Sequence, residues 1–317
     1  MSSSSMPEPP GGEAARLALD EVEEAEAILE QRPPKAEKAL GEGAESGRGG
    51  GWVTAALAAP GFVWIGFYLV APLVIIILVS FWTYSETGFQ QTWTIANYSE
   101  LFHDSTYWDN MRSTFVTSVI AVVACLVLGF PVAYFLALKV QSLRNQIALF
   151  VIALAPFWTS FLVRSVAWTY PLSDVLAIFG VSTPSNTSVR LAMIQLYILF
   201  MITPLFFTLA QVDRTAIEAA RDLGGNWFRT FTAVILPQTL PGIVIGSIFI
   251  FVLTMGEYGT VLVVGQNYIQ SVGTIVNSYI VGAVQYPQGA AAAVLLVLAL
   301  IGGVFVITRF SNLREEL

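Results

Sequence analysis

Long runs of uncharged, apolar residues are the feature that most limits what this chain can fold into. After Gly51 they recur to the end of the sequence, and only 12% of the 317 residues are charged, against about 25% in an ordinary soluble chain. A helix needs about 20 apolar residues to cross a bilayer core. Barrel strands alternate apolar and polar residues, and these runs do not. The sequence therefore predicts an all-α integral membrane protein.

Six of these runs have the length of a membrane span. The predicted spans are 57–82, the uncharged stretch between Arg112 and Lys139, 147–164 or slightly beyond, 191–212, a fifth that begins after Pro241 and carries Glu257, and 290–308. The segment between the fifth and sixth spans, GQNYIQSVGTIVNSYIVGAVQYPQG, is too polar for a span and too apolar for a free loop. We expect it to form a short helix at the outer surface.

The basic residues indicate the orientation of the spans, because cytoplasmic loops retain Lys and Arg. With the N-terminus inside, the inner connections carry Lys139, Arg144, Arg214, Arg221, Arg229, Arg309 and Arg314. The outer connections carry Glu86, Glu100, Asp104, Asp109 and Asp174, with Arg112 and Arg190 only at span edges. This asymmetry predicts that both termini are cytoplasmic.

Residues 1–51 have a different composition from the rest of the chain. They hold 11 acidic and 5 basic residues, which accounts for −6 of the total charge of −7, and they contain no aromatic residue. Such a segment buries too little apolar surface to offset its chain entropy. It also lacks the basic start and apolar core of a signal peptide. We expect a disordered acidic cytoplasmic tail; the alternative is a docking segment for a partner.

An ordered polar insert, EAARDLGGNWFRTFTAVILPQTLPG, fills the connection between the fourth and fifth spans at residues 218–242. Ala219 and Ala220 leave a smooth patch that another surface can approach closely. Gly224 and Gly225 permit a turn that other residues resist. The pattern predicts a short helix, a sharp bend and a second helix on the cytoplasmic side.

This insert resembles the EAA loop of ABC importer permeases. The match consists of Glu218, Ala219, Ala220, Gly224, Leu236 and Pro237, with Val234 where the family has isoleucine. In that family the loop is a coupling helix that sits in a groove of the ATP-binding subunit. The resemblance implies that these residues pass the movement of an ATPase to the spans.

A second stretch is similar to polyamine-type permeases of this family. Its matching residues are Pro156, Phe157, Trp158, Ser160, Leu162, Val163, Arg164, Ala167 and Trp168. The segments 129–138 and 251–265 also resemble that subfamily, so the likeness covers about 57–310. One departure follows Tyr258, where GTVLVVGQN replaces the usual proline and Gly-Gly turn.

The resemblance implies a type I ABC importer permease fold with six transmembrane helices. Its expected parts are the tail 1–51, a first transmembrane helix and outer loop at 52–112, a permease core at 113–309 with the coupling loop at 212–240, and a cytoplasmic C-terminal tail at 310–317. The implied function is translocation of spermidine or putrescine across a bacterial plasma membrane. The alternatives are another small organic solute, such as an opine, phosphonate or amino-acid-like compound, and a self-sufficient secondary transporter.

The partners expected from the resemblance are cytoplasmic ABC ATPase subunits, a second permease that is a different chain, and an extracytoplasmic substrate-binding protein. The chain has no G-x-x-x-x-G-K-[ST] motif, so ATP and Mg²⁺ are expected on the partner ATPase. One His and one Cys cannot form a disulfide or a Cys/His metal cluster. We predict no catalytic residue, bound cofactor, metal or nucleic-acid partner.

Two charged residues, Glu257 and Arg164, fall within or near predicted spans. A charge at mid-membrane is costly, so each should face protein or water. Glu257 either attracts a cationic substrate or pairs with Arg164 or another helix. Trp158 and Tyr258 are candidates for cation–π contacts with an ammonium substrate, although aromatic residues also form interfacial belts.

Prolines interrupt four of the predicted spans, at Pro131, Pro156, Pro204 and Pro241. Each removes a backbone hydrogen bond. They indicate either simple kinks or breaks that line a water-filled cavity.

Overall fold

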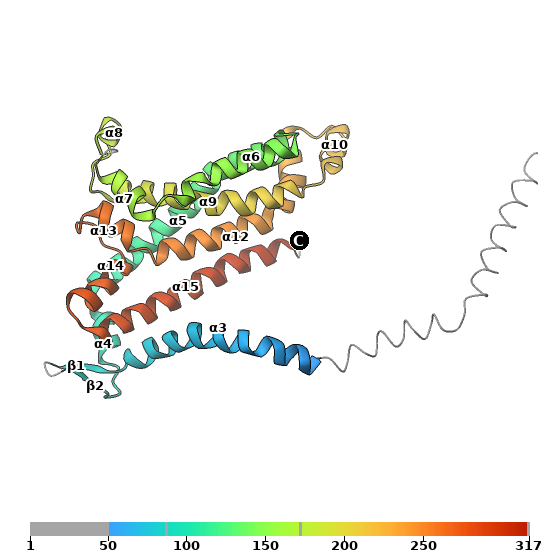
Figure 1. The fold of residues 1–317 in the computed structure, drawn as a ribbon. Coiled ribbons are helices and arrows are strands. Elements are labelled where there is room, and N and C mark those ends of the chain that lie inside the picture. Colours follow the sequence, from blue (N-terminus) through green and yellow to red (C-terminus); the bar gives the residue numbers. More distant parts are fainter. Residues whose placement is uncertain (1–50, 86–87, 171–172, 316–317) are drawn as a thin grey trace, which may run out of the picture. The chain divides into compact units, whose positions relative to one another are not determined.

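The structure is a computed structural model that describes residues 51–85, 88–170 and 173–315 (Figure 1). All but the last residue of the predicted tail 1–51 lies outside the described residues. The chain divides into two units, one ending at Ala71 and the other beginning at Pro72. Helix α3, Gly51–Val79, contains this boundary. The sites discussed below all lie in the second unit.

Among the described residues, up to six helical segments could cross a membrane if one bent pair counts as a single span. Five segments are long and apolar enough to cross a membrane: Leu57–Val79, Ser105–Lys139, Asn186–Ala210, Trp227–Met255 and Tyr286–Arg309. The sixth consists of Leu143–Trp158 and Phe161–Thr169, which meet at an angle of 76°. The helical membrane fold predicted from the apolar runs is confirmed.

The bent pair differs from the continuous helix predicted at 147–164. Helix α6, Leu143–Leu154, leads into the 3₁₀ turn η3, Ala155–Trp158, and helix α7, Phe161–Thr169, follows. Pro156 lies at the start of η3. Proline removes a backbone donor and its ring crowds the preceding turn, which explains why the straight helix ends here.

The second span begins earlier than predicted. Helix α5, Ser105–Tyr134, starts before Arg112, and the π-helical turn η2, Phe135–Lys139, continues it. Asp104 caps the start of α5, since its side chain accepts a hydrogen bond from the Thr106 N–H at 2.9 Å. Pro131 stays inside the helix. The start of this helix is therefore set by its cap, Asp104. It is not set by Arg112, the charged residue at the edge of the apolar stretch.

The fifth span also begins earlier than predicted. Helix α11, Trp227–Thr230, continues through the π-helical turn η4, Phe231–Ile235, into helix α12, Leu236–Met255. The prediction that the span starts after Pro241 is wrong, because Pro241 lies inside α12. Glu257 is not within the span as predicted: it follows the end of α12. Pro237 has no backbone N–H to donate, and the wider π turn just before it accommodates this missing hydrogen bond.

Helix α9, Asn186–Ala210, is central to the second unit, with half of its most apolar stretch buried. It packs with α5 and α12 in one hydrophobic core. Helix α15, Tyr286–Glu315, packs beside α12 in a second cluster that includes Phe251 and Leu296. In contrast, none of the side chains in the most apolar stretch of α3 is buried.

Shorter elements close the ends of the bundle. They are the hairpin of β1, Thr83–Ser85, and β2, Gly88–Gln90, and the helices α4, Ala96–His103, α8, Ser173–Ile178, α10, Arg214–Asp222, α13, Gly259–Gly265, and α14, Val272–Asn277, with the π turn η5, Ser278–Gly282. Figure 1 shows α10 at the same end of the second unit as the start of α6 and the end of α15, with α4, α13 and α14 at the other end.

The segment predicted as a short helix at the outer surface lies at the end of the second unit opposite α10 (Figure 1), where its Tyr268 and Val281 side chains are exposed. It contains the end of α13, all of α14 and η5. Val272 is fully buried, and its N–H donates to Thr114 Oγ1 of α5 at 3.1 Å. Apolar packing of Val272 against the core anchors α14 at this end of the bundle, while other residues of the segment stay exposed.

A close approach between α9 and α12 depends on Gly242. A Cβ atom at this position would lie 2.8 Å from the Pro204 carbonyl oxygen and would also meet Thr208 Oγ1. We expect Gly242→Ala to destabilise the protein by about 1–3 kcal/mol, the usual cost of overpacking. Thermal unfolding of the purified protein measures this. Gly302→Ala is the control, since a Cβ there meets nothing within 4 Å. Equal stability of the two variants would contradict this packing role.

Candidate functional site

The first candidate site is the two-helix loop formed by α10 and α11. Asp213 caps α10, accepting hydrogen bonds from the Thr215 N–H at 2.9 Å and the Thr215 hydroxyl at 2.8 Å. These hydrogen bonds from Thr215 lower the pKa of the Asp213 carboxyl. On the opposite side, Ile217 is buried and packs into the main core. The cap and this apolar anchor fix the direction of the helix.

The bend after α10 is a Schellman motif. The Gly225 N–H donates to the Ala220 carbonyl at 2.9 Å, and the Gly224 N–H donates to the Arg221 carbonyl at 2.8 Å. Gly224 has φ +77°, the left-handed conformation that this motif requires. Asn226 then caps α11 by accepting from the Arg229 N–H at 2.8 Å. The predicted helix, bend and second helix are therefore all present.

The six EAA-like residues occupy two places. Glu218 and Ala219 are exposed on α10, Ala220 is half-buried, and Gly224 is exposed in the bend. Leu236 and Pro237 instead begin α12. Beside the exposed face of α10 lie the exposed side chains Leu223, Trp227 and Phe228. The loop therefore presents small and apolar side chains outside the bundle, where another protein can bind them.

The second candidate site is a cavity of about 710 Å³ near the end of α12. It is lined by Phe161, Leu162, Tyr197, Val252, Leu253, Gly256, Glu257, Tyr258, Gly259, Leu262 and Val263. Helices α7, α9, α12 and α13 all contribute to this wall. An apolar cavity with a few converging polar groups is the usual form of a small-molecule site.

Both carboxylate oxygens of Glu257 have partners inside the protein. Oε1 accepts from the Thr260 N–H at 2.8 Å, at the start of α13, and Oε2 accepts from the Tyr197 hydroxyl of α9. Its backbone carbonyl accepts from the Ser271 hydroxyl at 3.0 Å. Glu257 is only 9% exposed. The side chain thus ties α9 and α13 to the end of α12, and the backbone carbonyl adds the start of α14.

The other three pathway candidates have different environments. Tyr258 lines the cavity and is half exposed. Trp158 is 79% exposed and is not among the cavity-lining residues. Arg164 lies on α7, and its Nε and Nη1 atoms are buried without a hydrogen-bond partner among the described residues. The structure therefore brings Glu257 and Tyr258 to the cavity, and Glu257 bonds to Tyr197 of another helix.

Three residues at this site are not evident from the sequence. Tyr197, Thr260 and Ser271 hold Glu257, yet the sequence marks none of them as a partner of Glu257, although Thr260 lies in the family-like segment 251–265. A tyrosine within an apolar span is the one available signal, because a buried hydroxyl requires a partner.

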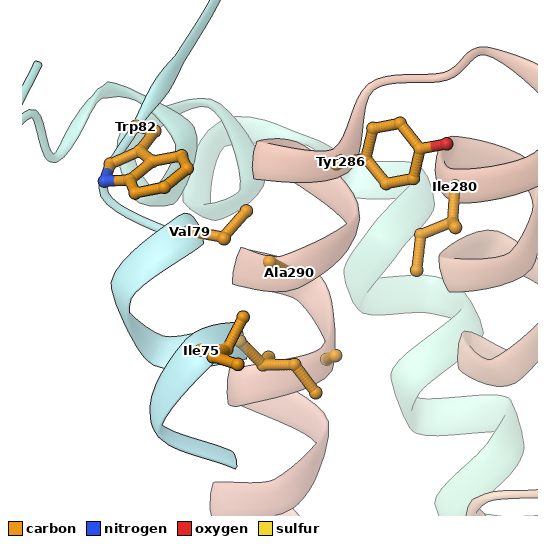
Figure 2. A pocket seen from close by; sticks show the side chains of 8 residues that line it. Ile75, Val79, Trp82, Ile280, Tyr286 and Ala290 are labelled. Atoms are coloured by element: carbon orange, nitrogen blue, oxygen red, sulfur yellow. The ribbon is translucent and has the colours of Figure 1, made fainter. Parts of the chain in front are cut away.

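Another cavity, of about 390 Å³, is entirely different in character (Figure 2). It is lined by Ile75, Ile76, Val79, Trp82, Ile280, Tyr286, Ala290 and Ala293. Figure 2 shows mainly aliphatic side chains around it, with Trp82 and Tyr286 as the aromatic members. This lining contains no Asp, Glu, His, Lys or Arg, and the described residues contain no cluster of three or more His, Cys, Asp or Glu residues for a metal ion.

Comparisons with known proteins support the assignment of the fold and family. No family model matches the chain. The spermidine/putrescine transport system permease protein PotB of Haemophilus influenzae is 30% identical over 272 residues, which covers 80% of this chain and 93% of that protein. PotB of Escherichia coli is 30% identical over 250 residues, with coverage of 75% and 90%.

Among solved structures, a bacterial ABC transporter involved in the import of the acidic polysaccharide alginate shares the fold. Its matching chain has a TM-score of 0.61 at 16% identity, and the match covers 82% of this chain and 95% of that one. The chain therefore shares the fold of membrane-spanning helices found in that transporter, and its 30% identity to PotB proteins makes it an ABC importer permease. By its sequence, the chain belongs to the PotB family of spermidine/putrescine permeases. It is a multi-pass inner-membrane subunit of an importer.

Proposed function

We propose that this permease translocates polyamines, with spermidine and putrescine as its substrates. The observation that carries this proposal is the 30% identity to PotB proteins over 80% of the chain. The cavity at the end of α12 is consistent with it, since the exposed face of Tyr258 can contact an ammonium group through a cation–π interaction. Another small organic solute remains the alternative substrate.

Glu257 is assigned a positioning role in this proposal. Both of its oxygens accept hydrogen bonds from the protein, so it fixes the cavity wall and the adjacent Tyr258. A free carboxylate would be needed for it to act mainly as a cation selector. Trp158 and Arg164 are proposed to lie along the wider pathway, outside the cavity lining.

The loop of α10 and α11 is proposed to couple the spans to an ATPase. Lys139, Arg144, Arg214, Arg221, Arg229 and Arg309 lie in segments at this end of the second unit. Because basic residues stay on the inner side, this end faces the cytoplasm. Glu218, Ala219, Ala220 and Gly224 form the contact with the ATPase, and Leu236 and Pro237 connect it to α12. ATP and Mg²⁺ bind to that partner.

The complete importer is proposed to contain two different permease chains, a pair of ATPase subunits and an extracytoplasmic binding protein. One related structure contains an alginate transporter in complex with an alginate pentasaccharide-bound periplasmic protein. ATP binding moves α10, and the pathway opens toward the binding protein.

Uptake of labelled putrescine and spermidine tests this function. Cells that lack this chain should lose uptake and regain it when the chain is restored, and unlabelled polyamines should compete. Cells must also lack any other polyamine system, so that loss is visible. Unchanged uptake in that strain would contradict the polyamine proposal and shift the substrate to another small solute carried by the partner binding protein.

A further inference from the structure

A cleft of about 200 Å³ lies between the two helices of the cytoplasmic loop. Its walls are formed by Ala220 and Leu223 from α10 and the bend, by Gly225, and by Arg229, Thr230 and Ala233 from α11 and η4. The Schellman bend holds the two helices apart at this point. The cleft is therefore built by the fold of the loop itself.

The hydroxyl of Thr230 in this cleft wall has no hydrogen-bond partner among the described residues. Thr230 is only 3% exposed. Thr260 of α13 shares this property, whereas the Thr232, Thr239 and Thr254 hydroxyls each donate to the carbonyl four residues earlier in their helices. An unpaired buried hydroxyl destabilises a protein, so its presence here suggests a partner supplied from outside.

The chemistry of the cleft favours an anionic group. Arg229 is the charged residue in its lining, and its side chain is exposed. A guanidinium donates several hydrogen bonds in a planar fork that matches a carboxylate. Together, the Arg229 cation and the Thr230 hydroxyl donor suit a single acceptor group.

We propose that this cleft is a socket for an acidic side chain of the partner ATPase. The Arg229 guanidinium pairs with the entering carboxylate, and the Thr230 hydroxyl donates to it. This inference rests on the proposed coupling function and adds a reciprocal contact: the loop enters the ATPase, and a side chain of the ATPase enters the loop.

The test compares Thr230→Val with the matched control Thr232→Val. The cognate ATPase is titrated onto the purified permease complex, and binding affinity is measured together with thermal unfolding of the permease alone. Thr230→Val should weaken ATPase binding about tenfold, the usual effect of losing a hydrogen bond to a charged group. The unfolding temperature of the permease alone should stay the same or rise, because an unpaired hydroxyl is removed. Thr232→Val should bind within about twofold of the wild type.

A second variant tests the charge. Arg229→Gln should also weaken binding about tenfold and should reduce its dependence on salt, since screening acts on exposed charges. Wild-type affinity in Thr230→Val, or a lower unfolding temperature in that variant, would overturn the socket. Inorganic phosphate is also titrated onto the permease alone. If it binds and Thr230→Val abolishes that binding, the cleft is a site for a free anion and the socket is overturned.

The outcomes separate the socket from the coupling function. If the wild-type permease binds the ATPase and all three variants bind equally well, the socket is wrong and the coupling role stands. If the wild type itself does not bind the ATPase, both proposals fail.

Discussion

Replacing Glu257 with alanine is expected to abolish polyamine uptake and to destabilise the permease, whereas Glu257→Gln should preserve most of both. The carboxylate accepts hydrogen bonds from the Thr260 N–H and the Tyr197 hydroxyl. Alanine leaves both donors buried and unpaired, at a cost of about 1–3 kcal/mol each. The wall formed by α9, α12 and α13 would then lose its shared anchor.

Glutamine can keep both contacts. Its amide oxygen accepts from the Thr260 N–H, and its NH₂ group donates to the Tyr197 oxygen. We expect uptake by Glu257→Gln to stay within about threefold of the wild type, which corresponds to a free-energy change below about 1 kcal/mol. Tyr197→Phe removes one of the two contacts and should give an intermediate loss of stability.

Uptake kinetics and thermal unfolding should be measured on the same preparations. A Glu257→Gln protein that is as stable as the wild type and yet transports nothing would contradict the positioning role. It would show that the negative charge itself acts on the substrate. Stable Glu257→Ala would contradict the hydrogen-bond argument directly.

The second large effect is expected at the bend between α10 and α11. In Gly225→Ala, the new Cβ would collide with the Ala220 carbonyl oxygen, which also accepts the Gly225 N–H. The Schellman hydrogen bond cannot form without moving the backbone. We expect uptake to fall at least about tenfold, because the direction of the coupling loop changes by more than the contact with an ATPase tolerates.

Gly224→Ala is the matched comparison. Its φ of +77° makes any side chain strained, but a Cβ there meets nothing within 4 Å. The expected cost is about 1–2 kcal/mol in local backbone energy, with uptake reduced less than in Gly225→Ala. Gly224→Asp should lose more than Gly224→Ala, because its longer charged side chain projects into the proposed ATPase contact. Equal uptake by Gly225→Ala and the wild type would contradict the role of the bend.

The sequence predicted the helical membrane fold, the approximate spans and the folded cytoplasmic loop. These features depend on local properties: apolar length for a span, and Gly224 followed by Gly225 for a Schellman turn. The resemblance of the EAA-like stretch also identified the class of importer that the comparisons with PotB proteins confirm. Span limits were less accurate, because helix caps and π turns are set by a few neighbouring atoms.

The sequence misplaced Glu257 because apolarity continues past the residue where α12 ends. It was expected inside the fifth span, but the helix ends at Met255. The residues that hold it, Tyr197, Thr260 and Ser271, are separated from it by 60, 3 and 14 positions. No sequence spacing reveals a contact between two helices that are distant along the chain.

Whether a feature is determined by the sequence alone or only by the tertiary structure depends on how far apart along the chain its interacting residues lie. Apolar length and turn chemistry act within a few residues, so the sequence by itself determined that this chain spans a membrane and carries a bent two-helix loop. The contacts of Glu257 with Tyr197 and Ser271 and the cavity beside Tyr258 were decided only by tertiary packing. Each of these needs side chains from separate helices to meet, and that requires the helices to have packed first.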